Sequence, residues 1–415
     1  MRSTRAVTTI SAFLFALCAV AVFWLVSKPA SPEAPSATLA HASSAAAPTS
    51  ASAAPIEGEI RAVWMSFYEL MLPEGMSGDA FARKYEALFK QCEALGLNTI
   101  FIHVRPFSDA IYPSEYYPWS EILTGRQGTD PGYDPLRIFC DLATTHGLSV
   151  HAWINPFRAA RTADITRLSA GSPTLRRLNQ NDGWVRKAAG QFFWNPAVPE
   201  THALIYDGVR ELLLNYDITG IHIDDYFYPT TAKEFDAAQY EIYRKAGGTL
   251  SQDDWRRDLI NVFVRGLYNT VKNTNPDATF SISPAGDIQK NYSHLYADVA
   301  QWAREPGYCD WIIPQLYYGF EHQNVPFEAA AREWARLTYH PGCKLIFGLA
   351  AYKTGQEDEF AGSGRLEWTR QSDILARQTR LGRSLDTDGF ALYSITNIAK
   401  AERQNLQKLL NGAAH

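Results

Sequence analysis

The sequence has no excess of positive charge. Its 39 lysines and arginines are outnumbered by 44 aspartates and glutamates, and the formal net charge is -5. Nucleic-acid-binding domains carry a basic patch, so the composition gives no support to a nucleic-acid partner. Cysteine is also scarce, with five residues in 415. The first expected strand is not followed by the glycine-rich fingerprint of a dinucleotide-binding sheet, which weighs against an open, doubly wound fold.

The first 58 residues are expected to form a membrane signal and a linker. Arg2 and Arg5 precede an uncharged, mostly apolar run from about residue 8 to residue 26, which is long enough to cross a bilayer. Positive charge before such a run keeps the N-terminus in the cytoplasm. We predict a signal anchor over 1–28, with cleavage of this segment as the alternative. An Ala-, Ser- and Pro-rich linker follows over 29–58, and the rest of the chain is exported to the periplasmic or cell-envelope side.

From residue 59 to residue 412 a strand-then-helix pattern recurs eight times, as in a (β/α)8 TIM barrel. An open sheet is the structural alternative. The strands are expected near 60–67, 98–104, 148–154, 219–225, 278–283, 310–317, 344–350 and 388–394. The helices are expected near 79–95, 134–146, 200–216, 253–274, 293–304, 326–338, 369–382 and 398–411.

The connections that follow the strands are much longer than those that precede them. The long ones cover 105–133, 155–199, 226–252 and 351–368. Active sites of such barrels lie where strands end and helices begin. Loops beyond about 12–15 residues in a compact domain also tend to be functional. Both arguments place a site at the C-terminal face of the strands.

The stretch Gly220–Pro229 carries the strongest chemical signal. Within its strand, Ile221 and Ile223 alternate with His222 and Asp224, so one face is aliphatic and the other polar. The strand ends in two adjacent carboxylates and then Tyr226, a combination suited to chemistry on a sugar. We predict that Asp224 points into the barrel as the nucleophile, with Asp225 beside it at the rim.

Glycoside hydrolysis needs a second carboxyl that acts as an acid. Asp109, four residues beyond an inward-facing arginine, is the residue that we predict for this role. Asp287 and Glu321, which follow the fifth and sixth strands, are alternatives.

Alternation along the strands also predicts which polar side chains enter the barrel mouth. Such a mouth is too polar for packing alone and suits a hydroxyl-rich ligand. The substrate-binding candidates on these strands are Arg105, His151, Trp153, Asn155, His222, Gln315 and Tyr317. Tyr112, Trp119, Asn195 and Tyr226 complete the candidate set.

The chain resembles the glycosyl hydrolase-like 10 family of exported bacterial barrel proteins. The resemblance rests on Arg61-Ala-Val-Trp64, Val104–Ser114, Pro118–Gly125, Pro131–Leu136, His151–Pro156, Asn195-Pro196, Gly220–Pro229, Ile282–Pro284 and Pro314–Tyr317. It implies a glycosidase that acts on cell-wall polysaccharide, above all on peptide-free peptidoglycan glycan strands, with Asp224 or Asp225 central. After Ser283-Pro284 the chain departs from the family pattern, so the resemblance implies no catalytic role for Asp287.

Two other functions remain open at this level. His103, His151 and His222 could gather with Asp224 around a metal ion, as in a deacetylase of a cell-wall sugar. A non-catalytic glycan-binding barrel is the second alternative. The primary interpretation requires no metal and no cofactor, and its partner is a polysaccharide.

Four of the five cysteines lie in the exported region, where disulfides form. Cys309 and Cys343 each precede a neighbouring strand at the bottom of the predicted barrel. We predict a disulfide between them. Cys92 and Cys140 lie on the first two helices, which should also be adjacent, and the sequence does not choose among the three possible pairings.

Overall fold

The computed structural model describes residues 58–72 and 75–412. The predicted anchor and most of the linker lie outside these residues. Within the described part of the chain, no helix is both long and apolar enough to cross a membrane.

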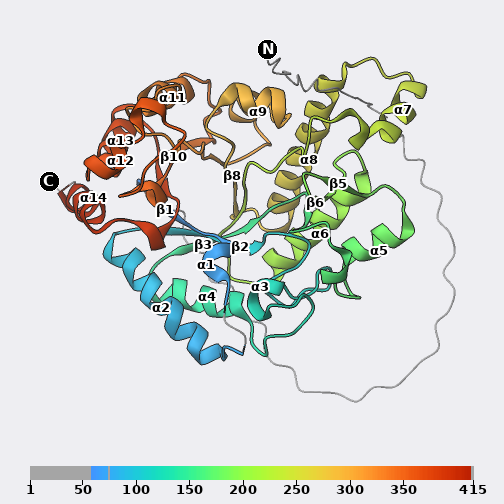
Figure 1. Cartoon of the computed structure of the whole chain (residues 1–415), viewed down its shortest axis with the longest axis horizontal. Coiled ribbons are helices and arrows are strands. Elements are labelled where there is room, and N and C mark those ends of the chain that lie inside the picture. Colours follow the sequence, from blue (N-terminus) through green and yellow to red (C-terminus); the bar gives the residue numbers. More distant parts are fainter. Residues whose placement is uncertain (1–57, 73–74, 413–415) are drawn as a thin grey trace, which may run out of the picture.

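Eight parallel strands close into a barrel, which confirms the predicted fold class (Figure 1). In sequence order they follow one another around the ring, and the last strand pairs with the first. They are β1 (Ile60–Met65), β2 (Thr99–Arg105), β3 (Ser149–Ile154), β7 (Gly220–Ile223), β8 (Thr279–Ile282), β9 (Trp311–Ile312), β10 (Lys344–Leu349) and β11 (Gly389–Leu392).

β9 is much shorter than the expected strand over 310–317. Pro314 has no backbone N–H to donate, so the hydrogen-bond ladder is interrupted there. Pairing continues beyond it only as isolated bridges from Gln315 to Ala285 and to Gly348.

Helices surround the barrel on its outside (Figure 1). The longer ones fall where the sequence predicts them: α2 (Gly78–Ala94), α4 (Pro135–Thr145), α6 (Pro199–Asn215), α8 (Gln252–Thr274), α11 (Phe327–Ala335), α13 (Ile374–Ser384) and α14 (Lys400–Gly412). The window expected near 293–304 is instead split into α9 (Ile288–His294) and α10 (Val299–Arg304). Asp298 starts the second of these helices by accepting a hydrogen bond from the Gln301 N–H.

The connections that follow the strands carry short elements of their own. The helical ones are α1 (Phe67–Leu70), α3 (Glu121–Thr124), α5 (Pro173–Gln180), α7 (Ala237–Lys245) and α12 (Glu367–Arg370). The loop after β3 also forms a three-stranded antiparallel sheet of β4 (Arg158–Ala160), β6 (Gln191–Trp194) and β5 (Val185–Ala188), in that order. This sheet was not predicted from the sequence. It orders the loop that reaches over the barrel mouth.

The interior of the barrel has an aromatic core of its own. Trp64, Phe101, Trp153 and Trp311 are buried there together with small and aliphatic side chains of β1, β10 and β11. A larger apolar core fills the space between the barrel and the helices. Because large rings fill the inside of the barrel, the polar cavity is confined to its C-terminal end.

The expected disulfide between Cys309 and Cys343 is not formed. The two residues do meet, with their sulfur atoms 3.8 Å apart, but both are free thiols. A disulfide requires about 2.05 Å between the sulfurs. Cys92 and Cys140 are also free and buried.

Candidate active site

A cavity of about 250 Å³ opens at the C-terminal ends of the barrel strands. This is the face at which the loop lengths predict a site. The lining comes from every barrel strand except β10, or from the residues after it: Trp64, Ser66, Phe67, Tyr68, His103, Trp153, Asn155, Arg158, Asp224, Asp225, Tyr226, Ser283, Gln315, Tyr317 and Tyr393. Among the predicted site residues, the structure brings together Trp153, Asn155, Asp224, Asp225, Tyr226, Gln315 and Tyr317.

β7 delivers the two aspartates to this cavity. The strand begins at Gly220, where a Cβ atom would lie 2.6 Å from the carbonyl oxygen of Thr279 and 2.8 Å from the His151 ring. Only glycine lets β7 approach its neighbours this closely. Three residues further on the strand ends, and Asp224 follows as a buried side chain, 5% exposed, while Asp225 is partly exposed.

The two carboxyls influence each other's ionisation. Burial raises the pKa of Asp224 well above its usual range, and the negative charge of Asp225 raises it further. Burial also raises the pKa of Asp225, although Lys290 and a hydrogen bond from Gln315 act in the opposite direction. Two carboxylates this close in a buried site do not both ionise easily. The pair therefore retains one proton at a pH where ordinary aspartates have lost theirs.

Three histidines form a layer with the aromatic rings below and beside the aspartates. His103 stacks on Trp153 with ring centroids 3.7 Å apart. His222 accepts a hydrogen bond from the Trp64 indole N–H at 3.0 Å, and its other nitrogen lies 2.9 Å from the Ser281 hydroxyl. His151 stacks on Trp311. His151 and His222 therefore support the floor of the cavity and do not line it.

Burial keeps these imidazoles neutral. It lowers the pKa of His151 to about 3 and those of His103 and His222 well below the usual value. The part of the chain that the structure describes contains no group of three or more His, Cys, Asp or Glu side chains placed to hold a metal ion. His151 and His222 are occupied in stacking and hydrogen bonding, and His103 stacks on Trp153 with its Nε2 3.0 Å from Asn155 Oδ1.

Several buried polar atoms of the cavity wall have no hydrogen-bond partner within the described chain. They are His103 Nδ1, Trp153 Nε1, Asn155 Nδ2, Arg158 Nε and Ser283 Oγ. Buried polar groups in native proteins are nearly always paired, so each exception calls for an explanation. A ligand rich in hydroxyl groups would pair with such atoms.

Four other predicted residues are placed away from the cavity. Arg105 donates to the carbonyl oxygen of Phe107 at 3.3 Å and lies over the Tyr117 ring. Tyr112 packs edge-on against Tyr216 in the outer core.

Asn195 accepts a hydrogen bond from the Ala197 N–H and donates to Gln239, so it fixes the end of β6. Trp119 packs against the outer core, and its backbone pairs with Ala110. These residues stabilise the loops around the site.

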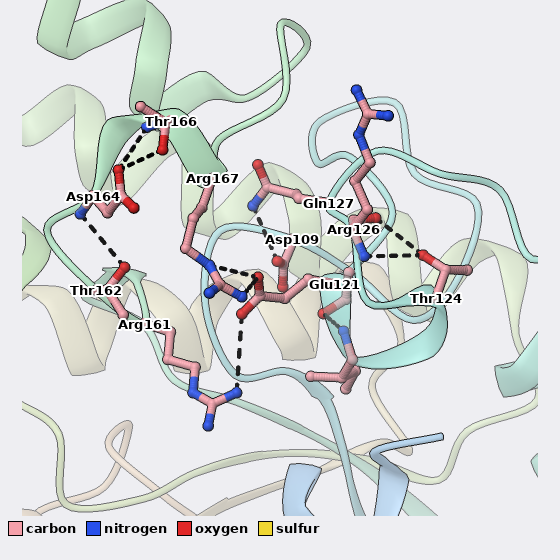
Figure 2. Close-up of polar contacts among 12 residues, drawn as sticks. Asp109, Glu121, Thr124, Arg126, Gln127, Arg161, Thr162, Asp164, Thr166 and Arg167 are labelled. Atoms are coloured by element: carbon pink, nitrogen blue, oxygen red, sulfur yellow. Dashed lines mark hydrogen bonds and ion pairs between the residues drawn. The ribbon is translucent and has the colours of Figure 1, made fainter. Parts of the chain in front are cut away.

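Asp109 does not line the cavity either, and Figure 2 shows it among polar side chains that include Gln127, Glu121 and Arg167. It accepts a hydrogen bond from Gln127 Nε2 at 3.0 Å and lines a narrow hollow shared with Glu121, Arg161 and Arg167. Burial raises the pKa of Asp109 to about 6. Its placement does not bring it to the bond that Asp224 and Asp225 would act on.

The sequence reading missed three prominent wall residues. Trp64 alternates with Ala62 on β1, and Tyr393 directly follows β11. Alternation along these strands could therefore have predicted that both side chains point into the barrel. Arg158 belongs to β4 and reaches the mouth only because the loop after β3 folds back. Its guanidinium lies over the rings of Phe107 and Tyr226, 4.5 Å from each centroid.

Comparison with known proteins gives consistent matches. The model of the family described as glycosyl hydrolase-like 10 matches residues 59–362. The chain is 35% identical over 345 residues to the glycosyl hydrolase YngK of Bacillus subtilis (strain 168), a match that covers 78% of this chain and 66% of YngK. It is 32% identical over 315 residues to the glycosyl hydrolase DigH of Escherichia coli (strain K12), covering 68% of this chain and 70% of DigH. The chain thus spans about two thirds of the length of these relatives.

Solved structures share the fold at low sequence identity. The glycoside hydrolase domain of PgaB (BpsB) from Bordetella bronchiseptica superposes with a TM-score of 0.55 at 14% identity, covering 84% of this chain and 99% of that domain. The α-L-fucosidase isoenzyme 2 from Paenibacillus thiaminolyticus gives a TM-score of 0.54 at 14% identity, covering 86% and 49%. At this level of identity the likeness shows the barrel fold alone.

Proposed function

The chain belongs to the glycosyl hydrolase-like 10 family, and we propose that it hydrolyses glycosidic bonds of a bacterial cell-wall polysaccharide. The preferred substrate is a peptidoglycan glycan strand stripped of its peptides. Asp224 and Asp225 supply the acid and base chemistry, and no metal or cofactor takes part.

One observation carries this proposal. Two adjacent carboxyls, whose pKa values burial raises, lie in a cavity whose walls present unpartnered polar atoms beside aromatic rings. Aromatic rings contact the apolar faces of a sugar, and unpaired donors and acceptors receive its hydroxyl groups. A proton held close to a carboxylate is what glycoside hydrolysis requires.

The location of the protein is part of the same proposal. Arg2, Arg5 and the apolar run after them support export, with the catalytic barrel on the periplasmic or cell-envelope side. The Ala-, Ser- and Pro-rich linker would let a tethered barrel reach the cell wall.

Incubation of the purified protein with peptide-free peptidoglycan glycans, followed by mass spectrometry, tests the function. We expect shorter glycans from the wild-type protein and a loss of at least about a hundredfold in rate for Asp224→Asn. Wild-type rates from Asp224→Asn would contradict the assignment of the site. Binding without any product would instead favour a glycan-binding barrel.

A further inference from the structure

The carboxyl groups of the cavity come from a single strand. Asp224 and Asp225 are consecutive residues after β7, with Cα atoms about 3.8 Å apart. Among the described residues that line the cavity, these two are the only aspartates or glutamates. Asp287 and Glu321 do not line it, because the first caps α9 through the Lys290 N–H and the second pairs with Arg370 at 2.7 Å.

The described residues of the opposite wall offer no carboxylate. In the ring of eight strands, β11 is four places from β7 in either direction, so Tyr393 faces the aspartates from across the barrel. Glu69 lies behind this wall, but its oxygens accept hydrogen bonds from the Ser66 N–H and from the hydroxyls of Ser394 and Thr396. It is held in place as part of the α1 cap.

The tyrosines of the cavity are proton donors and not nucleophiles. Burial raises the pKa of Tyr393 to about 12 and raises that of Tyr317 well above its usual value. Both phenols therefore stay protonated at neutral pH. They can donate hydrogen bonds to a substrate oxygen, but a phenolate is not available to attack carbon.

Both standard routes of glycoside hydrolysis need carboxyls on opposite sides of the scissile bond. The carboxyls are about 5–5.5 Å apart when one acts as the nucleophile and about 6.5–9.5 Å apart when one activates a water. A cavity whose carboxyls share one wall has no carboxyl on the opposite side of the scissile bond. The group that attacks the anomeric carbon must then come from the substrate.

We propose that this protein cleaves 2-acetamido glycans by using the acetamido oxygen of the substrate as the nucleophile, with Asp224 holding the acetamido N–H and Asp225 acting as acid and base. This inference rests on the proposed function and names the chemical group that the substrate must carry.

The surroundings of the two carboxyls assign their roles. Asp224 is the deeper one and lies next to Trp153, near the aromatic floor that also includes Trp64. An acetamido group placed there puts its N–H near the Asp224 carboxylate and its methyl group on apolar rings. Asp225 is partly exposed and lies beside Gln315 and Lys290. It can therefore reach the leaving sugar and later the incoming water.

The reaction is balanced in two steps. In the free protein burial favours the proton on Asp224, and the acetamido N–H, by donating a hydrogen bond to the Asp224 carboxylate, moves this proton to Asp225. In the first step, Asp225 gives the proton to the glycosidic oxygen, the bond from that oxygen to the anomeric carbon breaks, and the acetamido oxygen bonds to that carbon. The Asp224 carboxylate stabilises the positive charge on the resulting bicyclic oxazolinium through its N–H. In the second step, water attacks the anomeric carbon, the bond to the acetamido oxygen breaks, and Asp225 takes the proton of the water. Two inversions give net retention.

Chemical exchange of the acyl group provides the test. Peptide-free glycans are N-deacetylated and then re-acylated, one portion with acetyl groups and the other with trifluoroacetyl groups. Fluorine withdraws electrons from the carbonyl oxygen, so we expect kcat on the trifluoroacetyl glycan to fall at least about tenfold below kcat on the re-acetylated glycan. Equal kcat values would overturn the acetamido mechanism and leave the proposed function standing. Failure to cleave the re-acetylated glycan would overturn the proposed function as well.

A binding measurement separates the two aspartates without relying on turnover. A thiazoline analogue of the bicyclic intermediate is titrated into the full chain by calorimetry. We expect Asp224→Asn to weaken its binding at least about tenfold and Asp225→Asn to weaken it less than about threefold. Glu321→Gln is the matched control, since Glu321 is on the same face of the barrel but outside the cavity, and it should bind like the wild type. Wild-type affinity in Asp224→Asn, or no binding to the wild type, would overturn the proposal.

Discussion

Asp236 and Arg256 form an ion pair in which neither side chain is exposed. Arg256 donates to both carboxylate oxygens, at 2.7 and 2.9 Å, and also to the carbonyl oxygens of Thr230 and Ala232. The Tyr228 hydroxyl donates to the same carboxylate. The pair joins α8 to the loop that follows β7, because Asp236 lies in that loop eleven residues after Asp225. It thereby fixes the path of the chain that carries Asp224 and Asp225.

Asp236→Ala should strongly destabilise the protein, because it leaves the Arg256 charge buried without a partner. Breaking a buried pair in this way costs about 3–5 kcal/mol. The free energy of unfolding from urea titrations measures the effect. Glu328→Ala removes one partner of an exposed ion pair with Arg332 on α11. This variant should change the free energy of unfolding by less than about 1 kcal/mol. Similar losses in the two variants would contradict the role given to the buried pair.

The rate of hydrolysis should decrease as the pH rises through the raised pKa of the aspartate pair. The acid form is needed for the first step, and burial shifts its loss to a higher pH than that of an ordinary aspartate. Lys290 lowers the pKa of Asp225, so Lys290→Met should move the alkaline limb of kcat/KM to higher pH. Lys344→Met makes the same charge change at the bottom of β10 and should leave the profile unchanged. An unmoved limb in Lys290→Met would count against Asp225 as the acid.

Trp153→Phe should lower kcat/KM by roughly two- to tenfold, the worth of one hydrogen bond to the substrate. The indole N–H is buried in the cavity wall beside the Asp224 carboxyl, and phenylalanine keeps a ring against His103 while removing that donor. Thermal unfolding of the variant shows whether the barrel is intact. Trp184→Phe, at a ring that stacks on Arg177 outside the cavity, should retain full activity. Unchanged kcat/KM in Trp153→Phe would show that this donor does not bind substrate.

Asp109→Asn should stabilise the protein above pH 6 and leave hydrolysis intact. Burial raises the pKa of Asp109 from 3.8 to about 6, so folding favours the protonated form. The wild type therefore loses stability as the pH rises between these values, by up to about 3 kcal/mol. Asparagine carries no charge, and its carbonyl oxygen can still accept the hydrogen bond from Gln127.

Urea titrations at pH 4 and pH 8 should accordingly show a smaller decrease in stability for Asp109→Asn than for the wild type. A large loss of kcat at unchanged stability would instead restore Asp109 as a catalytic candidate.

The periodicity of the sequence was sufficient to predict the barrel and the strand β7 that leads to the aspartates. Alternation of Ile221 and Ile223 with His222 and Asp224 is a local property of an extended chain, so it predicts the inward direction of the acid without knowledge of the fold. The same reasoning placed Trp153, Asn155, Gln315 and Tyr317 at the mouth. It did not hold for Arg105, His151 and His222, which lie on regular strands but do not line the cavity.

Tertiary structure decided what the loops contribute. Asp109 and Arg158 both follow strands, yet the loop paths direct Asp109 into a separate hollow and fold Arg158 back over the cavity. Loop paths depend on long-range contacts, such as the sheet formed by β4, β5 and β6, which local patterns do not encode. Only barrel closure places Tyr393 opposite Asp224 and Asp225. The sequence by itself thus determined which strand carries the acids, whereas the closed fold decided that, among the described residues, no third carboxyl lines the cavity across from them.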